Sequence, residues 1–415
     1  MTAVDPNLSR LEGADRQRAV MRAMQRRMVD HLAAGQTTDM APGTMAVPAS
    51  AYTSAERDAL ERRVLFRRQP IVAGLSCDVP EPGSQMSFDA LGQPILIMRG
   101  KDGVLRAFLN ACRHRAARLV KDCGQGARIT CPFHGWTYDL EGRLVGVPGR
   151  VAFDGVERAD LSLLPVPVAE WHGLILVKGD PDAGPIDPDS HFAPIADEIR
   201  QLGLDKVVPV RKHVERVAAN WKFAQDTFFE GYHFNTLHPG TIGAAAYGNV
   251  TIHDAFGPHQ RVMMPYRFFG DWVGKPEDQW DEVPYQGIHL LFPNTVFYVG
   301  NLESLVKDKE DVTDRQIFGL WRGFPGEDAH SSFTMMATYR PAGQSDPQTV
   351  KEYEDLTDFI INVIATEDYA LCADGQKNLR ALPAGHKLFF GRNEGSLQSI
   401  HRHIEELLAA EAAES

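Results

Sequence analysis

The chain has 415 residues, a length that allows two to four domains. Its 43 Lys and Arg against 55 Asp and Glu give a formal net charge of −12, which argues against a nucleic-acid partner bound through a broadly basic surface. Apolar residues make up 43% and charged residues 24% of the chain, which excludes wholesale disorder. Since no run of about 18 apolar residues and no apolar signal core occur, we expect a cytoplasmic protein with no membrane partner.

Taken from the N-terminus, the pattern predicts a helical segment, an all-β region and a mixed region. Residues 14–35 have the periodicity of an amphipathic helix that ends at Gly35. From about residue 70 to 179, short apolar runs alternate with Gly, Pro and Asp turns, which is typical of short strands. A linker rich in Pro and Asp follows at 180–192, and strand-like and helix-like runs alternate beyond it. We therefore predict an α+β fold with three parts: residues 1–60 packing on the body, 61–180 forming an all-β domain, and 190–415 forming a catalytic domain with helices on an antiparallel sheet.

The cysteines are few and odd in number, which favours reduced thiols or metal ligands over a disulfide framework. Two of them begin short Cys–His pairs, Cys112-Arg-His114 and Cys131-Pro-Phe-His134. The other three have no such spacing, and we interpret them as structural or incidental thiols: Cys77, Cys123 and Cys372.

Each Cys–His pair offers one thiolate and one imidazole, so two such loops facing each other would close a four-ligand site. Zinc is one candidate, because Cys₂His₂ zinc sites are common. Their usual order, however, is two cysteines followed by two histidines, whereas here the order Cys–His is repeated. A [2Fe–2S] cluster with two cysteines on one iron and two histidines on the other uses this ligand set.

The two pairs resemble the signature of the Rieske proteins, which is Cys-x-His, a spacer of about this length, and then Cys-x-x-His. The flanking residues in CPFHGW also match. The resemblance implies that Cys112, His114, Cys131 and His134 bind a [2Fe–2S] cluster. One departure is Ala116, where many relatives have Gly, and we expect it to alter the geometry of the turn without touching a ligand.

A second group of chemistry-bearing residues lies early in the mixed region. Asp226, Glu230 and His233 have the i, i+4, i+7 spacing that places residues on one face of a helix. His233 and His238 are five residues apart, so an ideal helix would point them about 140° apart. We therefore expect the helix to end or bulge between them, as the Pro-Gly pair that follows indicates.

Two histidines and one carboxylate form the facial triad of non-haem Fe(II) oxygenases, which leaves positions open for O₂. Two histidines at this spacing are by themselves often only polar helix-end residues. Together with the Rieske-type signature, however, they resemble the large (α) subunit of the Rieske non-haem iron ring-hydroxylating oxygenases over most of the chain. The resemblance implies that His233, His238 and Asp368 bind a mononuclear Fe(II), because relatives carry an acidic pair eight or nine positions before a Gln such as Gln376. Glu367 remains the competitor of Asp368.

The resemblance also implies a catalytic role for Glu230, three residues before His233. The family's acidic residue at this position links the Rieske cluster of one subunit to the mononuclear iron of its neighbour. A homotrimer is thereby implied, with or without a small β subunit, and electrons reach it from NAD(P)H only through a partner reductase or ferredoxin. Many aromatic-ring dioxygenases carry Asp at this position, while relatives that oxidise quaternary ammonium compounds carry Glu, so the substrate class stays open. We expect Asp226 to orient a metal ligand or to hold a hydrogen-bond network.

The resemblance thus implies a terminal oxygenase that uses O₂ for mono- or dihydroxylation of an aromatic or other hydrophobic substrate, as in aromatic hydrocarbon catabolism. An oxidative N- or O-demethylase or monooxygenase acting on a quaternary ammonium or methoxy substrate is the alternative. A Rieske electron carrier without oxygenase activity is the remote alternative. An apolar and aromatic pocket would suit either substrate class, and we expect some of the following residues to line it: Phe228, Phe229, Phe234, Leu290, Leu291, Phe292, Val296 and Phe297.

Overall fold

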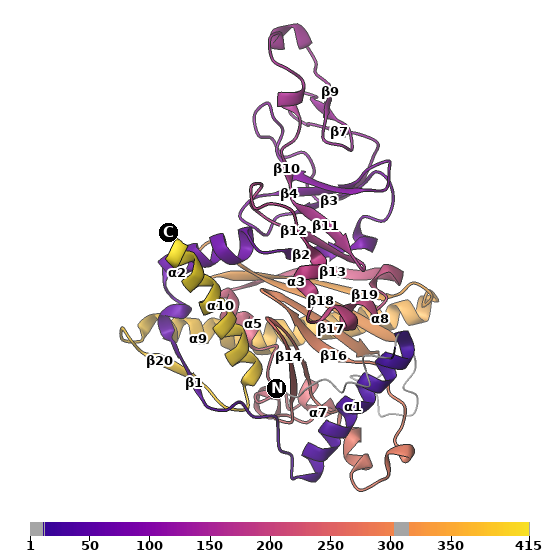
Figure 1. Cartoon of the computed structure of the whole chain (residues 1–415), viewed down its shortest axis with the longest axis vertical. Helices are drawn as coiled ribbons and strands as arrows, with labels where there is room; N and C mark the ends of the chain where they lie inside the picture. The colour runs from indigo at the N-terminus through magenta and orange to yellow at the C-terminus, as the bar shows by residue number, and fades with distance from the viewer. Residues whose placement is uncertain (1–10, 12, 303–314, 415) are drawn as a thin grey trace. The chain divides into compact units, whose positions relative to one another are not determined.

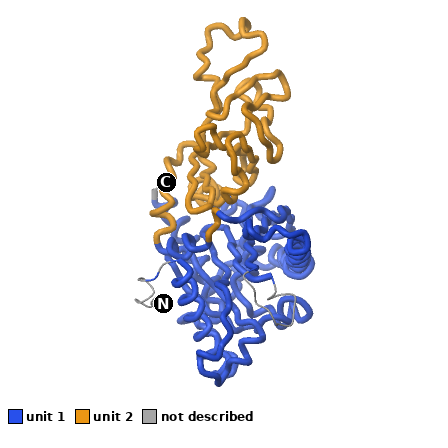
Figure 2. Tube along the Cα trace, turned by 90° about the vertical axis from the view of Figure 1, so that its right-hand side faces the viewer, with its two compact units in different colours: residues 1–61, 194–202, 206–415 blue, residues 62–193, 203–205 orange. Residues whose placement is uncertain are grey.

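The computed structural model describes residue 11 and residues 13–302 and 315–414, which divide into two compact units (Figure 2). Unit 2 contains residues 62–193 and 203–205. Unit 1 contains the described residues of 1–61, 194–202 and 206–415, so the chain segments on both sides of unit 2 fold together. None of the helices in the described part of the chain combines the length and the apolar character that crossing a membrane requires.

Unit 2 consists of three small antiparallel sheets. One sheet has the strand order β10-β5-β4-β3-β6, the second has the order β11-β12-β2, and the third has the order β7-β8-β9. A short helix, α3 (Pro188–Phe192), follows the last strand. The strands are β2 (Ile71–Leu75), β3 (Ser84–Phe88), β4 (Ile95–Arg99), β5 (Leu105–Leu109), β6 (Cys123–Gln125), β7 (Ile129–Thr130), β8 (Thr137–Tyr138), β9 (Leu144–Gly146), β10 (Pro165–Val166), β11 (Val168–Trp171) and β12 (Leu174–Val177).

Unit 1 is built on one seven-stranded antiparallel sheet with the order β13-β19-β18-β17-β16-β15-β14. Strands β14 to β19 follow one another along the chain, and β13 pairs with the last of them. The inner strands are buried along most of their length. The strands are β13 (Val207–Val217), β14 (Ile252–Phe256), β15 (His259–Met263), β16 (Gly287–Leu291), β17 (Thr295–Asn301), β18 (Gln316–Pro325) and β19 (Ser332–Pro341).

Helices from both ends of the chain pack on this sheet (Figure 1). Helix α5 contacts β18 and β19, helices α8 and α9 contact β13, and helices α1 and α10 contact β14. A two-stranded pair, β1 (Met45–Pro48) with β20 (Lys387–Phe390), joins the N-terminal and C-terminal segments. The helices are α1 (Gly13–Ala33), α2 (Ala55–Glu61), α4 (Ala196–Arg200), α5 (Trp221–Asp226), α6 (Phe234–Leu237), α7 (Ile242–Ala245), α8 (Pro347–Val363), α9 (Tyr369–Ala381) and α10 (Gly395–Glu414).

A buried ion pair fixes helix α5 against helix α2. The ammonium of Lys222 lies 2.5 Å from the Glu61 carboxylate, and the two side chains are 2% and 0% exposed. Glu61 also accepts hydrogen bonds from the indole N–H of Trp221 at 2.9 Å and from Arg57 at 2.8 Å. Because a buried charge is tolerated only when it is paired and fully hydrogen-bonded, this group holds α5 in one position.

The predicted α+β class is confirmed, with an all-β unit and a unit of helices on an antiparallel sheet. The amphipathic helix expected at 14–35 is α1. The helix expected to carry Asp226, Glu230 and His233 on one face was wrong, since α5 ends at Asp226. Tertiary packing overrides the local helical pattern there. A Cβ on Gly231 would lie only 3.0 Å from Met264 and 3.3 Å from Thr251. The chain therefore leaves the helix and passes close to both of these residues.

Candidate metal centres

The two Cys–His pairs lie in two loops of unit 2 that share one backbone pattern. The first loop follows β5 and the second connects β7 to β8. In each loop the cysteine N–H donates to the carbonyl five residues on, and the cysteine carbonyl accepts from the N–H four residues on. These bonds are Cys112 N to Ala117 O at 2.9 Å, Ala116 N to Cys112 O at 2.9 Å, Cys131 N to Trp136 O at 2.7 Å and Gly135 N to Cys131 O at 3.1 Å.

The four side chains of these pairs come together as the sequence predicts. The cysteines are buried, with Cys112 3% and Cys131 2% exposed, and the ring centroids of His114 and His134 lie 4.6 Å apart. The Nδ1 atom of His114 is buried and has no hydrogen-bond partner among the described residues. A buried ring nitrogen normally has a hydrogen-bond partner. The lack of one at this atom is explained if the nitrogen binds a metal ion. Two neighbouring thiols and two imidazoles therefore fit the [2Fe–2S] ligand set.

Aromatic residues of the second loop and β8 hold the first pair in place. The indole ring of Trp136 stacks on the His114 imidazole, with the ring centroids 5.0 Å apart and the planes 8° from parallel. The hydroxyl of Tyr138 lies 3.4 Å from the Cys112 sulfur. Burial raises the pKa of the Cys112 thiol, so a cation is needed to keep it as thiolate at neutral pH.

The second histidine carries a cationic neighbour that sequence reasoning missed. The Arg115 guanidinium donates to Nε2 of His134 at 2.6 Å, and it also lies over the Phe133 ring, 4.2 Å from its centroid. Desolvation and the charge of Arg115 lower the pKa of His134 and favour the neutral imidazole that a metal requires.

The departure at Ala116 falls on a strained backbone position. Ala116 has a φ of 53°, and Gly135 at the equivalent place in the second loop has a φ of 71°. Left-handed backbone costs an L-residue about 1 kcal/mol, and glycine escapes that cost. We therefore expect Ala116→Gly to move the denaturant midpoint for loss of the cluster's visible absorbance to higher concentration. Ala117→Gly, at a position outside the left-handed region, should move it down, and equal shifts in both variants would contradict the strain.

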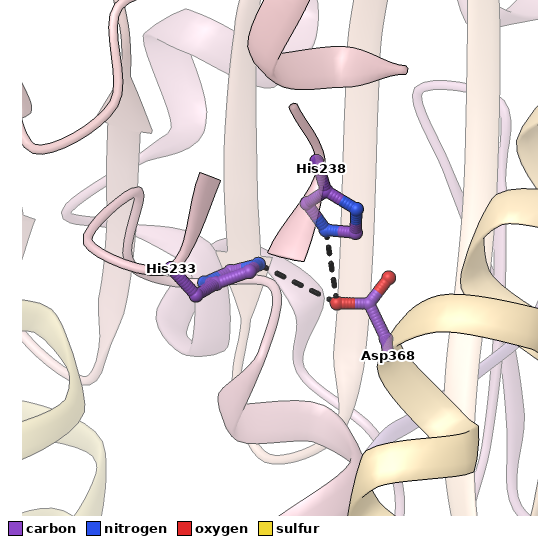
Figure 3. A group of neighbouring side chains, drawn as sticks. All are labelled: His233, His238 and Asp368. Carbon is purple, nitrogen blue, oxygen red and sulfur yellow. Dashed lines mark ion pairs between the residues drawn. The ribbon is translucent and has the colours of Figure 1, made fainter. Parts of the chain in front are cut away.

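The three residues predicted to bind mononuclear iron meet in unit 1 (Figure 3). One oxygen of Asp368 lies 3.4 Å from Nε2 of His233 and 3.3 Å from Nε2 of His238. One potential ligand atom from each residue lies within 4.8 Å of those of the other two. The histidines flank the short helix α6: His233 directly precedes it and His238 directly follows its last residue, Leu237. The helix therefore ends before His238, as the spacing of the two histidines required.

The carboxylate comes from a wide helical turn between α8 and α9. Residues Ile364–Asp368 form a π-helical turn, η10, a feature that often marks functional sites. The last two residues of this turn, Glu367 and Asp368, have different roles. Asp368 faces both Nε2 atoms, whereas Glu367 accepts from Nδ1 of His238 at 2.6 Å and from the Thr241 hydroxyl at 3.0 Å.

Both histidines are therefore held by a carboxylate on the nitrogen that faces away from Asp368. Glu230 accepts from Nδ1 of His233, as Glu367 does from His238. This arrangement fixes the tautomer that leaves Nε2 free for a metal, a support common around metal-binding histidines. No spacing in the sequence predicts the pairing of Glu367 with His238, because the two residues are remote along the chain.

The site is electrostatically prepared for a cation. Burial lowers the pKa of His233, but hydrogen bonds to Asp368 and Glu230 outweigh it and raise that pKa to about 9. Burial raises the pKa of Asp368, but hydrogen bonds and the charges of both histidines lower it overall. In the absence of a metal, protons thus lie between the histidines and the Asp368 carboxylate. A divalent cation bound there would displace these protons.

All three residues border a cavity with a volume of about 870 Å³, which includes its opening to solvent. Of the eight residues expected to line a pocket, Phe228 and Phe234 do so, and the other six are buried elsewhere in the unit. The remaining lining is mainly aliphatic and aromatic and includes Val262, Ile360, Ile364, Tyr298 and Trp321.

Asp226 lies in a separate hydrogen-bond network. Its carboxylate accepts from the Tyr52 hydroxyl at 2.8 Å and contacts Nε2 of His401 at 3.1 Å. Tyr52 precedes α2 and His401 lies on α10, so the network joins both ends of the chain to the end of α5.

Two protein-family models match the chain. The model of the Rieske [2Fe-2S] domain matches residues 69–165, and the model of the ring hydroxylating alpha subunit (catalytic domain) matches residues 204–410. The first match contains both Cys–His pairs, and the second contains His233, His238 and Asp368.

Curated relatives with similar sequences include mono- and dioxygenase subunits. The carnitine monooxygenase oxygenase subunit of Acinetobacter baumannii is 31% identical over 223 residues, which cover 52% of this chain and 58% of the relative. The chlorobenzene dioxygenase subunit alpha of a Cupriavidus species is 29% identical over 238 residues, which cover 54% of this chain and 53% of the relative. The chain thus spans about half the length of the curated relatives it matches.

Solved structures share the fold over most of the chain. The quaternary ammonium Rieske monooxygenase CntA in complex with L-carnitine has a TM-score of 0.70 at 22% identity, covering 86% of this chain and 94% of that one. Naphthalene 1,2-dioxygenase from a Rhodococcus species bound to indole also has a TM-score of 0.70, at 18% identity, covering 94% and 98%.

Proposed function

Because the chain belongs to the α subunits of the Rieske ring-hydroxylating oxygenases, we propose that it is the terminal oxygenase component of a multicomponent enzyme. The observation that carries the proposal is the single Asp368 oxygen that faces the Nε2 atoms of His233 and His238 at the wall of an apolar cavity. A protein that only carries electrons on a cluster does not require a second set of metal ligands. Nor does it require the carboxylates that orient both histidines.

The family's domains carry a [2Fe–2S] cluster and a mononuclear iron. The orphaned Nδ1 of His114 beside two buried thiols supports the first assignment, and the donor set around Asp368 supports the second. The proposed cluster ligands are Cys112, His114, Cys131 and His134. The proposed iron ligands are His233, His238 and Asp368.

His233, His238 and Asp368 would hold a mononuclear Fe(II), which would supply O₂ activation for insertion of oxygen into an adjacent substrate, with electrons from a reductase. The protein's part is to hold and orient. Glu230 and Glu367 hold the Nδ1 protons of His233 and His238, which keeps both Nε2 atoms aimed at one point. The cavity wall, with rings such as Phe228, keeps bulk water from the substrate.

The cavity favours a hydrophobic or aromatic substrate, because its described lining is mainly aliphatic and aromatic. A quaternary ammonium substrate is the second candidate, since relatives are named for carnitine and glycine betaine. The rings of Phe228, Tyr298 and Trp321 would suit such a cation through cation–π attraction.

The proposed partners are a reductase or ferredoxin and further copies of the same chain. Glu230 supports the second of these, because it touches His233 from the position at which the family's acidic residue links neighbouring subunits. We propose a homotrimer of this chain, either alone or with a small β subunit bound to each copy. Mass photometry of the protein, expressed with and without neighbouring genes, distinguishes these assemblies.

The oxygenase assignment is tested by following electrons and oxygen together. Protein loaded with iron and sulfide, a ferredoxin–reductase pair, NADH and ¹⁸O₂ are incubated with aromatic and quaternary ammonium compounds. We expect ¹⁸O in the product of one class, formed in proportion to NADH oxidised. Cluster reduction without O₂ consumption for any compound would support the electron carrier instead.

A further inference from the structure

The cavity beside His233, His238 and Asp368 is mainly apolar but holds one buried amide that no group in the described part of the chain satisfies. Gln286 lines the cavity and is 2% exposed. Neither its amide oxygen nor its amide nitrogen has a hydrogen-bond partner among the described residues. An unsatisfied buried polar group costs about 1–3 kcal/mol, and in a native structure it requires an explanation.

A second polar group, the Tyr298 hydroxyl, also lines this cavity. Gln286 directly precedes β16, whose first residue, Gly287, pairs with Val299 on β17, the strand that carries Tyr298. A Cβ on Gly300 would lie 1.9 Å from the Tyr298 hydroxyl oxygen, so the Tyr298 side chain extends along its strand across Gly300. Glycine at this position leaves room for that hydroxyl.

The hydroxyl of Tyr298 can only act as a neutral group. Burial raises the pKa of Tyr298 well above its usual range, so the phenol stays protonated at physiological pH. Its ring stacks on Trp321, with the centroids 5.7 Å apart and the planes 8° from parallel, which holds it along the cavity wall. The Gln286 amide and the Tyr298 hydroxyl are therefore uncharged polar groups in a mainly apolar lining, and Tyr266, which also lines the cavity, lies beside the hydroxyl of Tyr298.

The charges of the cavity select against substrates that carry a carboxylate. Among the described residues that line it there is no Lys or Arg, and the only carboxylate is that of Asp368. A substrate carboxylate would lie there without a counter-ion, and burying an unpaired charge costs more than burying an unpaired amide. A neutral hydroxyl, carbonyl or carboxamide, by contrast, would satisfy Gln286.

We propose that Gln286 determines specificity by hydrogen-bonding a neutral polar group on an otherwise apolar, ring-sized substrate. The inference rests on the proposed function, because it concerns the cavity beside the assigned iron ligands, and it names the substrate class of that cavity. Of the two substrate classes proposed above it favours the first, and it predicts weaker binding of zwitterions such as carnitine and glycine betaine, which carry a carboxylate.

The test compares ring compounds with and without a hydroxyl group. Dissociation constants of p-cresol against toluene, and of 2-naphthol against naphthalene, are measured by calorimetry on the iron-loaded, anaerobic holoenzyme. In the wild type we expect the hydroxylated member of one pair to bind at least about 5-fold more tightly, since one satisfied buried hydrogen bond is worth about 1 kcal/mol or more. In Gln286→Met we expect that ratio to fall to about one, with the hydrocarbon bound no more weakly than before.

Gln225→Met is the matched control. Gln225 is also a buried glutamine whose amide has no partner among the described residues, but it lies outside the cavity lining. Its variant should keep the wild-type ratio. Should Gln286→Met misfold and lose the mononuclear iron of unit 1, Gln286→Asn serves in its place, because it keeps the amide but shortens its reach.

Three results would overturn the inference: an unchanged ratio in both Gln286 variants, no binding of any ring compound, or tighter binding of L-carnitine or glycine betaine. The proposed function fails separately, since it is judged by ¹⁸O incorporation and not by binding. A Gln286-dependent ratio without oxygenation would leave a specific binding cavity but remove the oxygenase.

Discussion

Replacing Asp368 with alanine should abolish oxygenation while leaving the Rieske-type centre intact. Asp368 supplies the only carboxylate oxygen that faces both Nε2 atoms among the described residues, so its loss leaves two histidines for a metal that needs three protein ligands. Loss of a partner that only supports a ligand typically costs 10–100-fold in metal affinity, so loss of the ligand itself should cost more than about 100-fold in iron affinity and turnover. Iron per chain, sulfide per chain and ¹⁸O incorporation measure the three effects.

Glu367→Gln is the control that separates the two members of the acidic pair. Glu367 holds Nδ1 of His238 and accepts from Thr241, so its variant should bind iron more weakly and still oxygenate. The assignment of Asp368 would be wrong if Asp368→Ala kept its mononuclear iron and Glu367→Gln lost it.

The second large effect is expected for Glu230→Gln. The amide keeps the size of Glu230 and can still accept from Nδ1 of His233, so both metal contents should stay near those of the wild type. The carboxylate charge that supports His233, and that we propose to act between subunits, is lost. We expect coupled turnover to fall by about 100-fold or more, measured as product formed per NADH oxidised in the presence of the reductase.

Glu394→Gln controls for the mere loss of a nearby negative charge. Its carboxylate interacts with the charge of Glu230 but accepts from the backbone N–H of Gly391. This variant should keep most of its turnover. Full activity in Glu230→Gln, or an equal loss in Glu394→Gln, would remove the specific role of Glu230.

Residues that lie close together along the chain could be predicted from the sequence. Cys112 with His114 and Cys131 with His134 form a spacing motif, and the structure brings both pairs together. His233 and His238 could be found for the same reason, because a short segment positions both. The α+β class followed from the change between short apolar runs and helical periodicity.

Features that depend on long-range packing could not be predicted in the same way. The helix expected through His233 ends at Asp226, because Gly231 must pass close to Met264. The separate roles of Glu367 and Asp368 depend on the wide turn between α8 and α9, which has no local signal in the sequence. Gln286 was missed for a similar reason, since segments remote along the chain come together to form the cavity that it lines.

The central claim is that one chain carries two separate iron sites, and EPR with nitric oxide tests it most directly. Nitric oxide binds a mononuclear Fe(II) at the position O₂ would take and makes that iron visible beside the reduced cluster. For the anaerobically reduced, iron-loaded protein we predict both signals, with the iron–nitrosyl signal reshaped by a compound of one substrate class. A cluster signal without a nitrosyl signal in fully loaded protein would contradict the account, and the assignment of His233, His238 and Asp368 would fall with it.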